Sequence, residues 1–355
     1  MSSQSFADSA ARSAGIDVPL QRIDLGAFAL ESGEVIEDCA VAWVEHGLQS
    51  TDAPVALVLS AIGSTHQRME FLIGPGLPLD TRRLRILAVN ALGSGLSVSP
   101  SNARRQHGHA FPRFTIRDMV RSQKCLLDRL GVSRLDLVAG ASMGGMQALQ
   151  WGVSYPDRMD RIVALSPLAR TPGWSAAINA AARQALAPLV QSPAWPCTRY
   201  PASAWQPWVL VMHALALRSP DRINAEVAGA QALPGWLMAQ AEAWAAQGRD
   251  PLDWIYQSWA YDAHDVGTTP GFGGDTAAAL ASISAATLVM GASLDLYNPV
   301  AGARWAAKHI PRSVYVEVPS NWGHLTFSAA DRPHAASIRQ QLLQFLWGTA
   351  EHSTS

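Results

Sequence analysis

Ser142 stands at the centre of the segment Gly140 to Gly144, which reads Gly-Ala-Ser-Met-Gly. The apolar run 135–139 precedes this segment and a helix-favouring stretch follows it, so the serine lies at an expected strand-to-helix turn. Small residues allow the turn to be sharp, and the amides at the start of the helix face the negative charge that develops on a carbonyl oxygen under attack. We therefore predict that Ser142 is a nucleophile.

Two polar residues, Asp295 and His324, follow two later apolar runs, 286–290 and 314–318. A serine hydroxyl attacks poorly at neutral pH unless a base removes its proton, and the base needs a third group to orient it. The carboxyl ends of parallel strands lie at one edge of a sheet, where loops bring such groups together. The chain order serine, acid, histidine is one of the orders in which this constellation occurs. We predict that Asp295 is the acid and His324 the base of a triad with Ser142.

A serine attack of this kind also needs two backbone amides that stabilise the oxyanion. The amide of Met143, directly after the serine, is the first candidate. The loop 58–66, which follows the apolar run 55–59, carries the second. The residues leave both Ile62 and Gly63 open as the second donor, and we take Ile62 as the candidate.

Short apolar runs alternate with stretches of helical periodicity along the chain. Such runs are typical of strands buried on both faces, and their alternation with helices predicts a parallel, doubly wound sheet. A hairpin is expected over 22–45, where a turn-rich segment separates two strand-like runs. The expected strands are 55–59, 84–89, 135–139, 161–165, 286–290 and 314–318, and the expected helices are 115–130, 143–155 and 334–347.

The composition changes over residues 171–282, where alanine-rich segments are separated by prolines. Eight of the thirteen tryptophans fall between Trp174 and Trp259, which sets this segment apart. We predict an inserted helical cap over 171–282, an α/β core made of 19–170 and 283–350, and a flexible arm over 1–18. The cap tryptophans fit either an apolar acyl pocket or a helical core.

The composition excludes several classes of function. The 355 residues include 27 basic and 28 acidic side chains, a net charge of −1, with no basic run that would attract nucleic acid or an anionic membrane. No apolar leader opens the chain, and its most apolar run, 208–217, is interrupted by His213. We therefore expect a cytoplasmic protein that contacts neither nucleic acid nor membrane and whose partner is a small-molecule acyl substrate.

The residue pattern predicts neither a metal nor a cofactor. Cys39, Cys125 and Cys197 are odd in number and show no paired spacing, which argues against a disulfide framework or a zinc ribbon. The histidines form no HExxH-type ligand pattern. Acyl transfer through a serine requires no cofactor.

Six segments of the chain match the motifs of one protein family: 111–120 (FPRFTIRDMV), 141–151 (ASMGGMQALQW), 155–158 (YPDR), 182–185 (ARQA), 264–267 (HDVG) and 323–324 (GH). With them, most of the sequence resembles the homoserine O-acetyltransferase family of α/β-hydrolase-fold proteins. The resemblance implies an α/β-hydrolase fold, with a mostly parallel doubly wound sheet and an inserted helical lid that often mediates dimerisation. It also implies a ping-pong mechanism through an acyl-serine, with Ser142, Asp295 and His324 as the triad.

Three positions depart from the family pattern where its transferases bind the amino-acid acceptor. An aspartate usually follows the catalytic histidine there, and this chain has Leu325. The family's arginine and tyrosine, seven residues apart on a lid helix, align without gaps with Leu210 and Leu217. A charged acceptor would lose its hydration there without gaining polar partners in the protein, which disfavours its binding. Apolar substrates therefore fit better. Arg183, in the ARQA segment, fits either substrate binding or an ion pair within the lid.

The residues together favour a serine-dependent acyl hydrolase, similar to a carboxylesterase, that acts on an ester or an activated acyl group. The alternative is an O-acyltransferase of the homoserine O-acetyltransferase type, which would use acyl-CoA and pass the acyl group to an alcohol instead of water. A non-catalytic binding protein with the same fold is the second alternative, which the intact triad disfavours.

Overall fold

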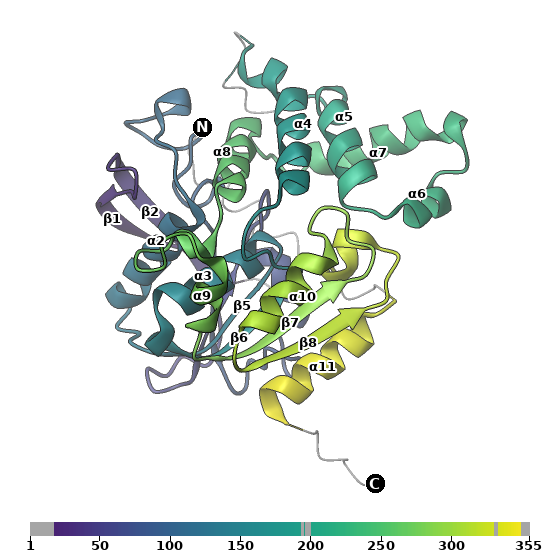
Figure 1. Ribbon diagram of the computed structural model, residues 1–355. Helices are drawn as coiled ribbons and strands as arrows, with labels where there is room; N and C mark the ends of the chain where they lie inside the picture. The colour runs from purple at the N-terminus through teal and green to yellow at the C-terminus, as the bar shows by residue number, and fades with distance from the viewer. Residues whose placement is uncertain (1–17, 193–194, 196–199, 330–332, 349–355) are drawn as a thin grey trace.

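The computed structural model describes residues 18–192, 195, 200–329 and 333–348. Cys197 and residues 1–17, almost all of the arm predicted over 1–18, lie outside these described residues. Within them, one sheet of eight strands runs through the molecule, with helices on both of its faces (Figure 1).

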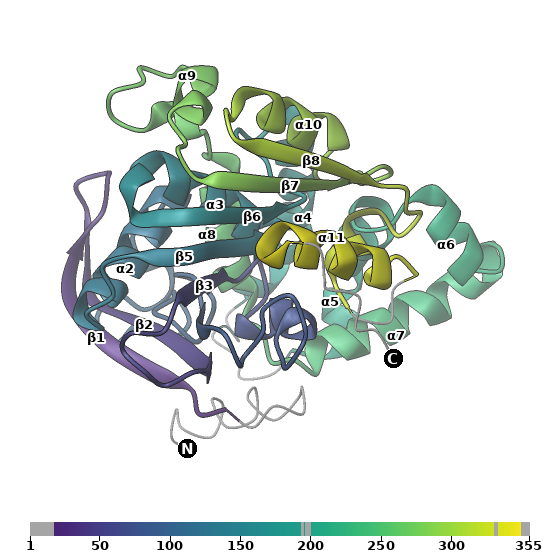
Figure 2. The same ribbon diagram turned by 90° about the horizontal axis from the view of Figure 1, so that it is seen from below.

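The sheet has the strand order β1-β2-β4-β3-β5-β6-β7-β8, and Figure 2 shows the strands from β1 and β2 at one edge to β8 at the other. β1 and β2 form an antiparallel hairpin, β2 also pairs antiparallel with β4, and the strands from β4 to β8 run parallel. The mostly parallel, doubly wound sheet expected from the sequence is confirmed. The strands are β1 (Gln21–Ala29), β2 (Val35–Gly47), β3 (Val55–Leu59), β4 (Arg85–Val89), β5 (Leu135–Ala141), β6 (Met159–Leu165), β7 (Ala286–Ala292) and β8 (Ser313–Val318).

Helices cover both faces of the sheet because its central strands are apolar on both sides; all of β3 is buried. On one face, α2, α3, α9 and α10 pack around Val138 and Trp151. On the other face, α11 and the 3-10 helix η1 pack around Val163 and Leu342. The bounds are α2 (Ile116–Arg129), α3 (Met143–Ser154), α9 (Thr276–Ala281), α10 (Val300–His309) and α11 (Ala335–Trp347), with 3-10 helices η1 (His66–Leu72), η2 (Gly108–Ala110), η3 (Pro156–Arg158), η6 (Val266–Thr268) and η7 (Gly323–Phe327).

The sequence predicts both ends of α2. Thr115 Oγ1 accepts a hydrogen bond from the Asp118 amide at 3.1 Å, while the Asp118 carboxylate accepts one from the Thr115 amide at 3.0 Å. This reciprocal capping box satisfies amides that have no partner within the helix. Gly131 follows the helix with a φ of +70°, which glycine adopts without strain. The fixed ends hold α2 beside α3, the helix that follows Ser142.

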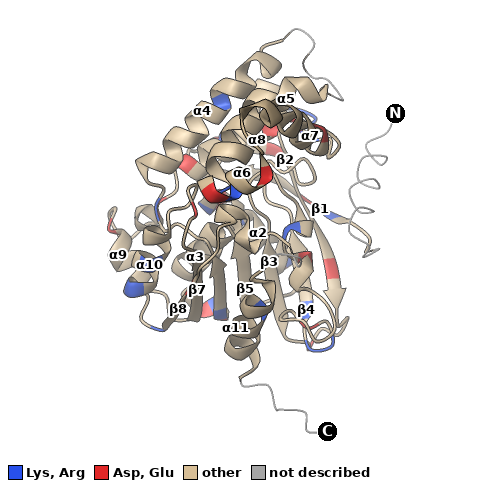
Figure 3. Cartoon of the chain, turned by 90° about the vertical axis from the view of Figure 1, so that its right-hand side faces the viewer, with Lys and Arg blue, Asp and Glu red and all other residues tan. Residues whose placement is uncertain are grey.

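A further layer of helices, which we call the cap, lies above the sheet, at the end where its parallel strands finish (Figure 1). Its members are α4 (Gly173–Val190), α5 (Ala202–Val209), the π-helical segment η4 (Leu210–Ala216), α6 (Pro220–Glu226), η5 (Ala230–Ala232), α7 (Leu233–Ala245) and α8 (Pro251–Asp262). α5 packs on α7 and α4 on α8, and the cap tryptophans Trp205, Trp208 and Trp254 share one apolar cluster with Met143 of α3. Figure 3, coloured by residue type, shows few charged residues on α4, α5 and α7. The cap therefore forms an apolar layer over the start of α3.

Only part of the segment 171–282, in which we expected the cap, belongs to this layer. Its last part, η6 and α9, packs against α3 and α10 in the helical layer of the sheet. The sequence of α9, Thr-Ala-Ala-Ala-Leu-Ala, fits any buried helix. Composition therefore does not say which layer α9 joins.

α3 approaches the sheet closely because two glycines lack side chains. A Cβ added to Gly140 would lie 2.3 Å from the backbone of Gly144, and one added to Gly144 would lie 2.5 Å from the carbonyl oxygen of Leu59. These neighbours are backbone atoms, which cannot give way as a flexible side chain does. α3 therefore rests directly on the ends of β3 and β5.

We expect Gly144→Ala to lower the free energy of unfolding by about 1–3 kcal/mol, because the new methyl group would push α3 away from β3. Gly235→Ala is the matched control, since Gly235 lies in α7 with no atom within 4 Å of an added Cβ. The control is expected to stabilise the protein by roughly 0.5–1 kcal/mol. Urea denaturation measures both differences, and wild-type stability of Gly144→Ala would contradict the close packing.

Candidate active site

Ser142 lies in the sharp turn between β5 and α3. Its φ of +57° falls in the left-handed region, which is unfavourable for a residue other than glycine and is often found at functional sites. Its amide donates to the carbonyl oxygen of Leu165 at the end of β6, at 2.8 Å, so the neighbouring strand fixes the turn. The turn places Ser142 at the N-terminus of α3.

Three loops bring Ser142, His324 and Asp295 into one hydrogen-bonded row. His324 Nε2 lies 2.8 Å from Ser142 Oγ, and His324 Nδ1 lies 2.7 Å from Asp295 Oδ2. Asp295 follows β7, and His324 lies in η7 after β8. All three residues are nearly enclosed, with exposed fractions of 2% for Ser142 and 4% for the other two. In this arrangement the imidazole can take the proton of the hydroxyl while the carboxylate faces its other ring nitrogen.

The Asp295 carboxylate is held by its own loop. Its Oδ1 accepts hydrogen bonds from the amides of Tyr297 at 2.9 Å and Asn298 at 2.8 Å, while Oδ2 meets His324. The Asn298 side chain donates to the carbonyl oxygen of Ser166, after β6, at 2.7 Å. The acid is thus oriented by two fixed amides and tied to the neighbouring strand.

An aromatic layer supports His324. The Tyr297 ring meets the imidazole edge to face, with 5.2 Å between ring centres, and the Tyr261 ring stacks on Tyr297 at 5.3 Å. Tyr297 donates its hydroxyl hydrogen to Asn179 Oδ1 at 2.5 Å, and burial raises the pKa of Tyr297 well above its ordinary value. The Tyr297 hydroxyl therefore stays protonated, and the layer gives His324 a neutral, largely apolar wall.

Arg183 lies further from the triad, in the contact between α4 and α8. Its Nη1 donates to Asp262 Oδ2 at 2.6 Å and to Ser258 Oγ at 3.0 Å. Asp262 also accepts from Asn179, the partner of Tyr297, at 2.7 Å. The guanidinium therefore takes part in an ion pair within the cap, the second of the two roles that the sequence left open.

Residues 61–64 form a tight turn after β3. The Ser64 amide donates to the carbonyl oxygen of Ala61 at 3.1 Å, and the Ala61 amide donates to Ser64 Oγ at 2.9 Å. Gly63, with a φ of +61°, donates its amide to Gln257 Oε1 of α8 at 2.8 Å. Three of the four amides are therefore bonded within the protein. Within the part of the chain that the structure describes, only the Ile62 amide of this turn has no hydrogen-bond partner, and it stays the candidate for the second oxyanion donor.

The start of this turn is joined to the helix that follows the nucleophile. Gln147, in α3, donates from Nε2 to the carbonyl oxygen of Ser60 at 2.9 Å. Ser60 Oγ in turn accepts from the Ala91 amide, after β4, at 2.9 Å. The loop that carries Ile62 is thereby fixed to α3, whose first residue, Met143, is the other predicted oxyanion donor.

Two of the three leucines that the resemblance places at acceptor-binding positions are neighbours beside His324. The Leu325 amide donates to the carbonyl oxygen of Leu217 at 3.3 Å, and Leu325 directly follows His324. A Cβ added to Gly323 would lie 3.0 Å from the same carbonyl oxygen, so the two segments touch. Leu210, the third of these leucines, lies in η4 and is 37% exposed.

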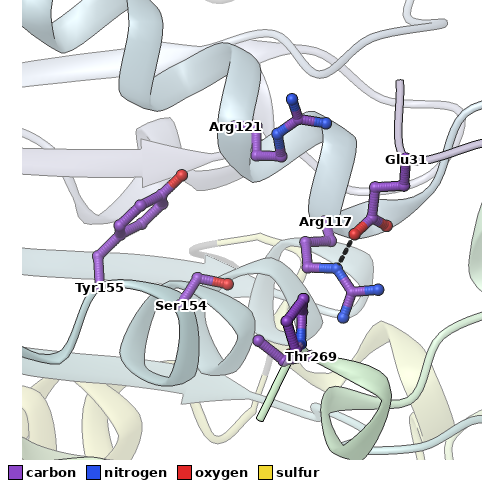
Figure 4. Close-up of a pocket in the computed structure, with 7 residues that line it drawn as sticks. Glu31, Arg117, Arg121, Ser154, Tyr155 and Thr269 are labelled. Atoms are coloured by element: carbon purple, nitrogen blue, oxygen red, sulfur yellow. Dashed lines mark hydrogen bonds and ion pairs between the residues drawn. The ribbon is translucent and has the colours of Figure 1, made fainter. Parts of the chain in front are cut away.

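The cavity of about 420 Å³ shown in Figure 4 lies away from this row. Ser154 and Tyr155 in its wall stand at the opposite end of α3 from Ser142. Arg117 pairs there with Glu31, and the other arginine in the wall also pairs with a carboxylate. Because these charges already balance one another, we assign no catalytic role to this cavity.

Comparison with known proteins gives the family. Residues 57–191 match the family described as alpha/beta hydrolase fold. The homoserine O-acetyltransferase of Clavibacter michiganensis subsp. michiganensis is 33% identical to the chain, in an alignment that covers 84% of this chain and 86% of that protein. The chain belongs to the homoserine O-acetyltransferase family. The resemblance and the α/β-hydrolase fold expected from the sequence are thereby confirmed.

Two solved structures similar to this member of the homoserine O-acetyltransferase family are esterases by name. The acetyl esterase MekB matches with a TM-score of 0.84 and 28% identity, over 92% of this chain and 96% of that one. An acetylester hydrolase from Corynebacterium glutamicum matches with a TM-score of 0.82 and 26% identity, over the same shares. Proteins named as transferases and proteins named as esterases thus share this fold, so the fold does not choose the acyl acceptor.

The described residues 18–192, 195, 200–329 and 333–348 contain no group of three or more His, Cys, Asp or Glu side chains placed to hold a metal ion. They also contain no helix that is long and apolar enough to cross a bilayer.

A buried acid ties α8 to the loop after β4. Asp253 accepts hydrogen bonds from the Ser101 amide at 2.9 Å and from the Ser101 hydroxyl at 2.6 Å. Burial raises the pKa of Asp253 to about 7, and the neighbouring Asp250 adds to the shift. In the folded protein this carboxyl therefore keeps a proton that the unfolded chain loses at a lower pH.

Because the pKa of Asp253 is higher in the folded than in the unfolded protein, its contribution to stability is largest at low pH. The contribution falls as the pH rises from about pH 4 to about pH 7. We expect the melting temperature of Asp253→Asn to fall less than that of the wild type over this range. Asp275→Asn, at the exposed N-cap of α9, is the control and is expected to follow the wild type. Parallel melting temperatures for the wild type and Asp253→Asn would contradict the shift.

Proposed function

We propose that the protein is a serine-dependent acyl hydrolase, similar to a carboxylesterase, that acts on ester or activated acyl substrates through an acyl-Ser142 intermediate. The observation that carries the proposal is the row of hydrogen bonds from Ser142 to His324 and from His324 to Asp295, at 2.8 and 2.7 Å. A serine so placed is activated by its base, and the base is oriented by the acid.

In the first half-reaction, His324 Nε2 takes the proton of Ser142 as its Oγ attacks the carbonyl carbon of the substrate. The carbonyl oxygen becomes an oxyanion, which the amides of Met143 and Ile62 stabilise. His324 then gives its proton to the leaving alcohol, the ester C–O bond breaks, and the acyl group remains on Ser142. Asp295 orients the imidazole and stabilises its charged form throughout.

In the second half-reaction, water takes the place of the alcohol. His324 removes a proton from water, whose oxygen attacks the acyl carbon and forms a second oxyanion at the same two amides. The bond to Ser142 Oγ breaks, His324 returns the proton to this oxygen, and the carboxylic acid leaves. These steps require no cofactor beyond the residues named.

Water as the acceptor is supported by the leucines near His324. The resemblance places Leu325 and Leu217 where transferases of the family carry polar residues, and the two segments touch beside His324. A charged amino acid would then be desolvated there without a partner. The two proteins named as esterases, at 28% and 26% identity, support the same choice.

O-acyl transfer from acyl-CoA to an alcohol is the second candidate. Its support is the sequence relatives, since the Clavibacter protein that aligns over 84% of the chain is named as a homoserine O-acetyltransferase. The similarity that supports transfer extends over most of the sequence. The residues that support hydrolysis are a few positions around His324. Both reactions share the first half-reaction, so the acceptor of the acyl group decides between them.

Location and assembly are predictions as well. A cytoplasmic location follows from the sequence argument, and a small acyl compound is the proposed partner. The cap is the proposed surface of a homodimer, because α7 is apolar in composition and only Ala241 of its residues is buried. An assembly that covers α7 would remove this apolar surface from water.

Turnover of p-nitrophenyl acetate by the wild type and Ser142→Ala, each with and without millimolar L-homoserine, tests both candidates. We expect the wild type to release free acetate at a rate that homoserine does not change. Ser142→Ala is expected to lose at least about 1,000-fold in kcat, because it lacks the nucleophile. Chromatographic identification of the acetyl product separates hydrolysis from transfer.

Ser154→Ala is the matched control, since Ser154 lies at the other end of α3 and is expected to keep the wild-type rate. O-acetylhomoserine as the main product would reject hydrolysis and establish the second candidate. Turnover by Ser142→Ala at the wild-type rate would reject Ser142 as the nucleophile.

A further inference from the structure

Helix α8 contacts the turn 61–64 with two side chains that stand one helical turn apart, Trp254 and Gln257. A Cβ added to Gly63 would lie 2.9 Å from Cδ1 of Trp254 and 3.1 Å from Cη2 of Trp244, so two indole rings pack directly on this glycine. The φ of Gly63, +61°, is one that glycine adopts without strain. Side chains of the cap therefore determine the shape of this turn.

Gln257 supplies the hydrogen bonds of this contact. Its Oε1 accepts from the Gly63 amide at 2.8 Å, and its Nε2 donates to the carbonyl oxygen of Leu92 at 3.1 Å. Gln257 is 1% exposed, and a carboxamide buried to this extent is tolerated because both of its ends are bonded. One planar group thus joins the loop after β3 to the loop after β4.

The Gly63 amide belongs to the peptide group that joins Ile62 to Gly63. A hydrogen bond to this amide therefore fixes the peptide plane directly after Ile62. The bond between the Ser64 amide and the Ala61 carbonyl oxygen fixes the other side of the turn. The Ile62 amide belongs to the preceding peptide group, between Ala61 and Ile62, so Gln257 fixes one of the two peptide planes that meet at Ile62. Without Gln257 this plane could rotate and the turn could shift, which would displace the Ile62 amide.

We propose that Gln257 is a positioning residue for the oxyanion hole: by holding the Gly63 amide, it keeps the Ile62 amide in the orientation that stabilises the oxyanion. The inference rests on the proposed function, because an oxyanion forms only when Ser142 attacks its substrate. Gln257 acts through the turn and not on the substrate itself. The cap is then a part of the catalytic geometry as well as a cover over it.

Reaction of Ser142 with ethyl p-nitrophenyl methylphosphonate tests this role in a single chemical step. Ser142 Oγ bonds to phosphorus, His324 takes the serine proton, the bond to p-nitrophenolate breaks, and the phosphoryl oxygen takes the place of the oxyanion. Release of p-nitrophenolate and the intact mass of the protein give the second-order rate constant.

Gln257→Met keeps the volume of the side chain and removes both hydrogen bonds. We expect it to slow phosphonylation at least about 10-fold, since the loss of one oxyanion donor costs roughly 100- to 1,000-fold and a displaced donor costs part of that. Gln150→Met is the matched control, because Gln150 is also 1% exposed and donates two hydrogen bonds, at 2.8 and 2.9 Å, far along α3 from Ser142. The control is expected to react at the wild-type rate, and melting temperatures show whether each variant is folded.

Gln257→Glu gives a second test should Gln257→Met unfold. Burial raises the pKa of the new carboxyl, so a protonated glutamic acid accepts from Gly63 and donates to Leu92 as glutamine does. We expect this variant to recover most of the wild-type rate. Equal rates for Gln257→Met and Gln150→Met, or a folded Gln257→Glu as slow as Gln257→Met, would overturn the positioning role. A wild type that is not phosphonylated would overturn the proposed function, and this inference with it.

Discussion

The close approach of α3 to the ends of β3 and β5 is the constraint on which the rest of the site depends. Gly140 and Gly144 permit this approach, since a Cβ on either would meet backbone atoms at 2.3 and 2.5 Å. The approach makes the turn at Ser142 sharp enough to require a φ of +57°. It also places the N-terminus of α3 next to the loop after β3. The nucleophile and the proposed oxyanion donors therefore lie close together.

Polar contacts in an otherwise apolar cap connect it to this region. α8 brings Gln257 to the turn 61–64 and Asp253 to Ser101, and both side chains are buried and bonded. A buried polar group that lost its partner would destabilise the folded state, so each of these contacts fixes the position of α8 strongly. The triad lies under this layer and is nearly enclosed, with Ser142 2% exposed.

The sequence predicts the strands and the position of Ser142, Asp295 and His324 at their ends, because each depends on a local pattern: an apolar run followed by a loop with a polar residue. It does not predict which of Ile62 and Gly63 is bonded, because the answer depends on Gln257, which is 194 residues further along the chain. A single glutamine in a helix rich in aromatic residues carries no signal of its own. The ion pair of Arg183 with Asp262 and the packing of α9 on the core likewise depend on contacts between segments that no local pattern encodes.

The central claim is that Ser142 carries the acyl group between the two half-reactions. Rapid-quench mass spectrometry of the wild type mixed with p-nitrophenyl acetate measures this most directly, because it locates the acetyl group during turnover. The account predicts one acetyl group on the peptide that contains Ser142, and none on the same peptide of Ser142→Ala. Acetylation of a different residue during turnover, with Ser142 left unmodified, would contradict it.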